Sequence, residues 1–201
     1  MHIFSGTLSV SGIPAGPAPT PQQSSSLEAA TGRTSPSLLA AAPAASAYPQ
    51  SNLSDGHRDL IEAINRAGVE VVADTGLCNE MKAEGYYNGE VVAICFRGRG
   101  WEAETLDTLR HEGQHVVQDC HYDGRTDFRF PGRSPLMPDP VSFALSTGMT
   151  ERQIDGISVT YSQMGADFKE VMMEVEAWAT ARAIPPEMIA DQIDNHCTAA
   201  Q

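Results

Sequence analysis

The segment that decides the fold reads Thr108-Leu109-Arg110-His111-Glu112-Gly113-Gln114-His115. It lies in a stretch from Glu102 to about Gln118 in which apolar residues recur at helical spacing, so the sequence predicts a helix there. Residues four apart on a helix share one face, and His111 and His115 therefore point the same way. Two imidazoles at this spacing can bind one zinc ion at Zn–N distances of about 2.0–2.1 Å. The pattern predicts a metal site on this helix.

The residue after the first histidine is Glu112. At that position a carboxylate lies beside the open coordination position of the metal, where it can take a proton from bound water and later deliver it to a leaving amine. HExxH fixes only three positions and also occurs by chance, but here an apolar hairpin strand precedes it and the other face of the helix is apolar. A catalytic zinc needs three protein ligands, so a third ligand must come from elsewhere in the chain.

Upstream of the motif lies a predicted hairpin. Its sequence is Gly85-Tyr86-Tyr87-Asn88-Gly89-Glu90-Val91-Val92-Ala93-Ile94-Cys95-Phe96. Asn-Gly between β-favouring residues is a strong hairpin signal, because both turn positions need a positive φ. We also expect a helix capped by Ser54 or Asp55, a strand over residues 69–72, a long loop over 119–149, a short helix from Thr150 interrupted by Gly156, and a long helix from Phe168 to Ala183.

A hairpin strand followed by HExxH resembles the zincin metallopeptidases over roughly residues 55–183. The resemblance implies an α+β fold in which a small sheet packs on the HExxH helix and a C-terminal helix, and in which the edge strand of the sheet lines the substrate cleft. It implies zinc as the cofactor, a protein or peptide as the substrate, and hydrolysis of peptide bonds with Glu112 as the catalytic residue and His111 and His115 as metal ligands.

The third ligand divides the zincins. In the glutamate-ligand (gluzincin-like) branch it comes from a later helix, often as Glu followed by Ala, and Glu176-Ala177 resembles that pattern. We expect Glu176 to be this ligand, because it shares a helix face with Met172 and Ala179 and a buried carboxylate needs a cation. Glu174 is an alternative ligand, although its place beside Glu170 and Trp178 is more typical of a rim residue or of a hydrogen-bond partner for a ligand histidine.

A second alternative ligand is His121, which stands at the position of the last histidine of the metzincin motif. The glycine that this motif requires is Gln118 here. Glycine serves there because the chain must turn sharply out of the helix, so Gln118 weakens the case for His121. Tyr161, His121 and His196 can each donate a hydrogen bond to a tetrahedral oxyanion, and the sequence does not choose among them.

Residues 1–50 form a separate region, which we expect to be an extended arm ahead of a domain over residues 51–201. The arm is rich in Pro, Ala and Ser and almost uncharged, so alone it buries too little surface to fold. Such an arm becomes ordered along a partner, which points to other protein subunits and a larger assembly. The HExxH segment is also similar to small zincin-like proteins of cyanobacteria and their phages, which suggests a virion component.

The remaining composition narrows the classes of function. The net charge of −13 argues against nucleic acid as the main partner. No apolar run reaches the length of a membrane span. The four cysteines lack a CxxC pair, which excludes a zinc ribbon, and we expect them to be buried thiols. If disulfides form, Cys120 and Cys197 are the first pair to test, because each follows a predicted helix.

Two functions from different classes fit these observations. The first is a zinc-dependent peptidase. The second is a structural or interaction subunit in which the zinc only braces the fold, and this second hypothesis predicts a metal whose fourth coordination position is closed or buried.

Overall fold

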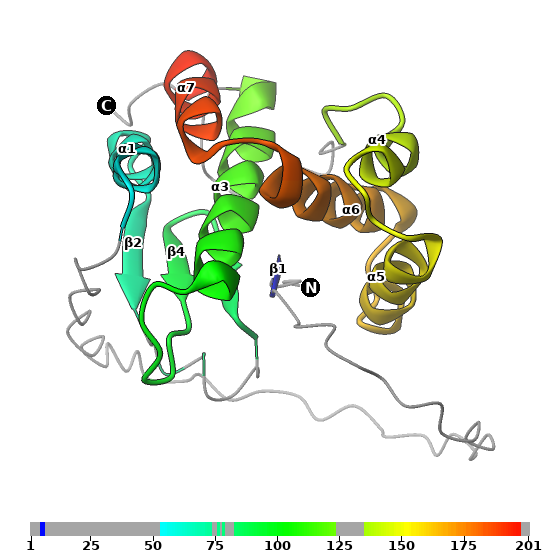
Figure 1. Ribbon diagram of the computed structural model, residues 1–201. Coiled ribbons are helices and arrows are strands. Elements are labelled where there is room, and N and C mark those ends of the chain that lie inside the picture. The colour runs from blue at the N-terminus through cyan, green and yellow to red at the C-terminus, as the bar shows by residue number, and fades with distance from the viewer. Residues whose placement is uncertain are drawn as a thin grey trace, which may run out of the picture.

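The structure is a computed structural model in which residues 5–6, 53–73, 76, 78, 83–123 and 135–197 are described. These residues form an α+β fold with a small sheet and six helices (Figure 1). The α+β class is therefore confirmed. The expected arm over residues 1–50 and its contacts with other subunits lie outside the described residues, apart from Ser5–Gly6. None of the described helices is long and apolar enough to cross a membrane.

The sheet is built around a hairpin. Strands β3 (Gly85–Tyr87) and β4 (Val91–Ile94) pair antiparallel, so the predicted hairpin is confirmed. Its turn differs from the expected one: Gly89 has a φ of 91°, but Asn88 does not have a positive φ, and its amide donates to the Val91 carbonyl. Strand β2 (Glu70–Ala73) pairs with β4 in the parallel sense. A two-residue strand, β1 (Ser5–Gly6), pairs antiparallel with the other edge of β3. The strand order is therefore β1-β3-β4-β2.

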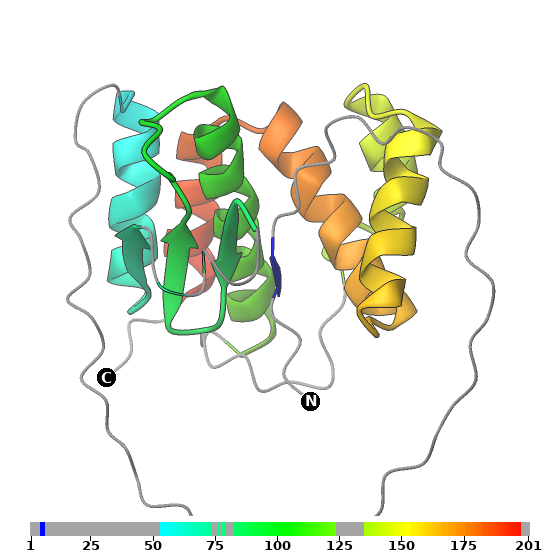
Figure 2. The ribbon, with the colours of Figure 1, turned by 90° about the horizontal axis from the view of Figure 1, so that it is seen from below.

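The helices fall on two sides of one central helix. Their bounds are α1 (Asp55–Arg66), α3 (Ala103–Asp123), α4 (Pro140–Ser146), α5 (Glu151–Gln163), α6 (Phe168–Ala183) and α7 (Pro186–His196). Helices α1, α3 and α7 share one apolar core with the sheet, and α4, α5 and α6 share a second. Figures 1 and 2 show α3 between these two groups, with α6 leading from one to the other. The helix that carries the HExxH motif is thus in contact with both cores.

Local sequence signals set most helix ends. The Ser54 hydroxyl accepts a hydrogen bond from the His57 amide and caps α1, and Thr150 forms a capping box with Gln153 at the start of α5. Helix α6 has the predicted bounds. Two predictions are wrong: α5 runs through Gly156, because its apolar face packs against α6, and the predicted loop over 119–149 holds the end of α3 and all of α4.

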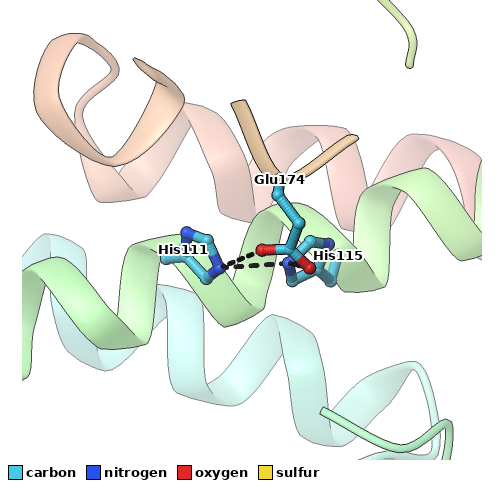
Figure 3. Close-up of side chains that lie close together, drawn as sticks. All are labelled: His111, His115 and Glu174. Atoms are coloured by element: carbon cyan, nitrogen blue, oxygen red, sulfur yellow. Dashed lines mark hydrogen bonds and ion pairs between the residues drawn. The ribbon is translucent and has the colours of Figure 1, made fainter. Parts of the chain in front are cut away.

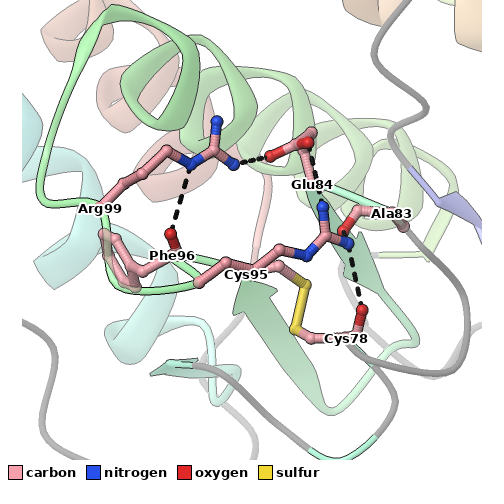
Figure 4. The surroundings of a disulfide bond; sticks show 7 residues. Cys78, Ala83, Glu84, Cys95, Phe96 and Arg99 are labelled. Atoms are coloured by element: carbon pink, nitrogen blue, oxygen red, sulfur yellow. Dashed lines mark hydrogen bonds and ion pairs between the residues drawn. A yellow bond between two sulfur atoms is a disulfide. The ribbon is translucent and has the colours of Figure 1, made fainter.

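The four cysteines form two disulfides, Cys78–Cys95 and Cys120–Cys197. The expectation of buried thiols is wrong, whereas the pair proposed for testing is confirmed. Figure 4 shows Cys78–Cys95 among side chains that hold the chain before β3: Arg97 donates to the carbonyls of Cys78 and Ala83, and both Arg97 and Arg99 bond to Glu84. The disulfide and these bonds hold Cys78, Ala83 and Glu84 in place near the start of β3.

Removal of the Cys120–Cys197 bond, in a Cys120→Ser/Cys197→Ser variant, is expected to lower the free energy of unfolding by about 2–4 kcal/mol. Its loop spans 77 residues against 17 for Cys78–Cys95, so the matching Cys78→Ser/Cys95→Ser variant should lose about 1 kcal/mol less. Urea unfolding in the presence of a chelator measures both. Equal midpoints for the Cys120→Ser/Cys197→Ser variant and the unmodified protein would contradict this role.

Candidate metal centre

Three side chains from two helices meet between α3 and α6. His111 and His115 lie one turn apart on α3 and face α6, from which Glu174 points back at them (Figure 3). The two Nε2 atoms are 3.1 Å apart, and the Glu174 carboxylate oxygens lie 3.3 Å from His111 Nε2 and 3.5 Å from His115 Nε2. Among the described residues this is the group of His, Cys, Asp and Glu side chains placed to hold a metal ion.

The separations between these donor atoms fit a small tetrahedral ion. Ligands at about 2.0–2.1 Å from a tetrahedral zinc lie about 3.3 Å from one another, and the observed separations run from 3.1 to 3.5 Å. Two imidazoles with one carboxylate form a donor set known from catalytic zinc sites, in which the fourth position is left to water. The group can therefore bind a metal ion.

The charges at the site are coupled. All three side chains are buried, and burial disfavours the charged form of each. For His115 burial acts to lower the pKa, but the Glu174 carboxylate outweighs it and raises the pKa of His115 to about 9. Conversely, burial acts to raise the pKa of Glu174, and the two histidines hold that pKa well below its usual range. Burial lowers the pKa of His111. Without a metal, a proton on His115 thus balances the buried carboxylate.

Gln118 fixes the orientation of His115. Its Oε1 accepts a hydrogen bond from His115 Nδ1 at 2.8 Å, and its Nε2 donates to the Met173 carbonyl on α6 at 3.2 Å. The proton on Nδ1 leaves Nε2 as the metal-binding nitrogen. From the sequence, Gln118 stood out only as a departure from the metzincin glycine. Its place three residues after His115, on the same face of the helix, is the signal that identifies this role.

His111 is held by packing. Its ring lies 4.6 Å from the ring of Trp178, which follows Glu174 by one turn of α6. On the opposite face of α3, a Cβ on Gly113 would lie 3.2 Å from Leu60 Cδ1. The glycine inside the motif therefore allows α3 to pack closely on α1, which holds the histidine face toward α6.

Glu112 lies at the boundary between α3 and the sheet. It is fully buried, and its Oε1 is 3.5 Å from the position that a Cβ on Gly85 would take. Strand β3 therefore passes directly beside the carboxylate that the motif predicts as the general base. The strand-then-helix order of the sequence places the two elements together in space.

The structure replaces Glu176 by Glu174 as the third candidate ligand. Glu176 is fully buried, as expected, but its carboxylate accepts hydrogen bonds from Gln114 Nε2 at 2.9 Å and from the Met137 amide at 3.1 Å. Burial raises its pKa despite these bonds, the opposite of the direction for Glu174. The buried Glu176 carboxylate was expected to need a cation. Its oxygens are instead satisfied by two amide N–H donors.

No protein-family model matches the chain, and no curated protein or solved structure matches it.

The three candidates for an oxyanion donor separate in space. Tyr161 is buried against the site: burial raises its pKa well above the ordinary value, and the neighbouring carboxylates of Glu174 and Glu112 add to this rise. The His121 and His196 rings instead lie 4.9 Å from each other, and both residues are exposed. His121, the alternative third ligand, is not part of the metal group. Of the three candidate donors, Tyr161 is the one that lies beside a candidate metal ligand, Glu174.

A cavity of about 390 Å³ lies on another face of α6. Its walls include Met137, Pro140, Val141, Phe168 and Met172. The Met137 amide bonds to Glu176, and none of the three candidate ligands lines this cavity. It is therefore separate from the metal group.

Proposed function

We propose that the chain is a zinc-dependent peptidase of the zincin type, in which His111, His115 and Glu174 hold the metal and Glu112 is the general base. One observation carries the proposal: three donor atoms lie 3.1–3.5 Å apart on two packed helices, and the first histidine is followed at once by a buried glutamate. The resemblance of the HExxH segment to zincins supplies the reaction class.

Each residue has a role that follows from its position. A bound zinc ion would supply a Lewis acid and a water molecule of lowered pKa. Glu112 takes the proton of the attacking water and returns it to the leaving amine. Gln118 keeps His115 in the tautomer whose Nε2 faces the metal. The Tyr161 hydroxyl remains protonated because its pKa is raised, so it can donate a hydrogen bond to the oxyanion of the tetrahedral intermediate.

A second candidate function is a structural metal site in a subunit of a larger assembly, such as a virion. The burial of the site favours it, since His111 and Glu112 are 0% exposed, His115 is 3% exposed and Glu174 is 5% exposed. A structural zinc site is closed, whereas a catalytic site keeps a position open to water. The two candidates differ in whether water and a peptide reach the metal.

The test is metal loading followed by cleavage. The purified chain is dialysed against zinc, its metal content is measured, and an unfolded protein is offered as substrate. We expect about one zinc per chain, cleavage that stops on chelation, and recovery when zinc is restored. Bound zinc without cleavage would support the structural candidate, and absence of bound zinc would contradict both.

A further inference from the structure

The outer edge of β3 has an occupant from the same chain. Ser5 pairs with Tyr87 and Gly6 with Tyr86, in the antiparallel sense. Without β1, β3 is the last strand of the sheet on this side, since the order is β1-β3-β4-β2. Figures 1 and 2 show β1 between the sheet and α6, on the side of α3 that faces α6. The segment therefore lies where the two halves of the fold meet.

Strand β3 is tied to the helix that carries the candidate ligands. The Tyr87 hydroxyl donates a hydrogen bond of 2.7 Å to Asp119 on α3. At the other end of the strand, a Cβ on Gly85 would lie 2.5 Å from the Thr108 side chain and 3.5 Å from Glu112 Oε1. A segment on the outer edge of β3 lies about 4.8 Å from β3. β1 is therefore one strand away from the strand that runs beside Glu112.

The edge of a sheet presents backbone N–H and C=O groups that bind an extended peptide through main-chain hydrogen bonds. The zincin resemblance implies that the edge strand of the sheet lines the substrate cleft. We propose that Ser5–Gly6, paired with the outer edge of β3, is an internal competitor of the extended peptide substrate for that edge. The inference rests on the proposed peptidase function. It adds a regulation of the same site: the intact chain excludes other peptides from the edge by pairing with itself.

An internal competitor has a distinct kinetic signature. It reduces the fraction of molecules whose edge is open, so the apparent affinity for an added peptide falls in proportion to that fraction. Once a peptide is bound, the competitor is displaced and the chemical step is unchanged. Removal of the competition therefore lowers KM and leaves kcat the same.

The experiment uses the full chain with Ser5→Pro and Gly6→Pro together. Of two consecutive residues in an antiparallel strand, one directs its N–H to the neighbouring strand. Proline has no N–H, so replacing both Ser5 and Gly6 removes the β1–β3 hydrogen bond whichever of the two donates it. The control carries Ser24→Pro and Ser25→Pro, two prolines elsewhere in the same arm. With zinc bound, we expect KM for an unstructured peptide to fall at least threefold in the Ser5/Gly6 variant with kcat unchanged, and to stay at its original value in the control.

A second readout does not depend on activity. Amide hydrogen exchange of the segment over residues 84–88 should be faster in the Ser5/Gly6 variant than in the control. If neither protein cleaves peptides, the proposed function fails by itself, and exchange alone then decides whether Ser5–Gly6 occupies the edge. Unchanged exchange overturns the inference. Faster exchange with an unchanged KM in the Ser5/Gly6 variant also overturns the inference. In that case Ser5–Gly6 would occupy the edge in the unmodified chain, but the substrate would bind elsewhere.

Discussion

Replacement of Glu112 by Gln is expected to lower kcat/KM for peptide cleavage by at least about 100-fold while zinc still binds. The amide has nearly the same shape as the carboxylate but cannot take a proton from water. Glu112 is not one of the three side chains whose donor atoms gather between α3 and α6, so its charge is needed for proton transfer and not for holding the metal. The loss should appear in kcat rather than in the zinc dissociation constant.

The matched control is Glu104→Gln. Glu104 lies on the same helix but is exposed, and its partner is Arg99 at 2.8 Å. Because an exposed ion pair contributes little to stability, this variant should cleave peptides at the original rate. Cleavage rates and zinc titrations of both variants make the comparison. Equal activity of Glu112→Gln and the unmodified chain would show that Glu112 is not the general base, and would favour the structural candidate if zinc still binds.

The elements with strong local signals could be predicted from the sequence. The β3–β4 hairpin could be predicted because Gly89 readily adopts the positive φ that a tight turn requires. The spacing of His111 and His115 places both on one face of a helix whatever the tertiary structure. Free thiols were expected, but Cys120 and Cys197 could be chosen as the first pair to test because each follows a predicted helix, and they form a disulfide. Each of these predictions depends on neighbours in the sequence or on helix geometry, and each is confirmed.

The third candidate ligand could not be predicted in this way, because α6 is buried on more than one face. Glu174 and Glu176 are both inside, at 5% and 0% exposure, so an inward direction does not distinguish them. The distinction comes from different neighbours. Glu174 faces α3, whereas Glu176 meets the Met137 amide in a segment that was expected to be a featureless loop. Helix α4, which follows this segment, is only seven residues long and begins at Pro140. It was missed because the surrounding stretch contains several Pro and Gly residues, which favour a loop.

The assignment of Glu174 leads to the second large effect. Glu174→Gln is expected to weaken zinc binding by more than about 100-fold, because a neutral amide replaces a charged ligand. Loss of a residue that only supports a ligand costs about 10–100-fold. Glu176→Gln is the control on the same helix. It should keep zinc affinity within about threefold, although loss of one buried hydrogen bond lowers the free energy of unfolding by about 1–3 kcal/mol.

Zinc titration followed by tryptophan fluorescence makes the comparison, because the ring of Trp178 lies 4.6 Å from that of His111 and senses the metal group. Urea unfolding in chelator separates lost affinity from lost folding in both variants. Glu174→Gln also removes the charge that stabilises the proton on His115, so the pKa of His115 should fall toward the low value that its burial favours. If Glu176→Gln loses zinc and Glu174→Gln keeps it, the third metal ligand is Glu176 and not Glu174. The opposite result places the metal between α3 and the face of α6 that carries Glu174, directly beside Glu112.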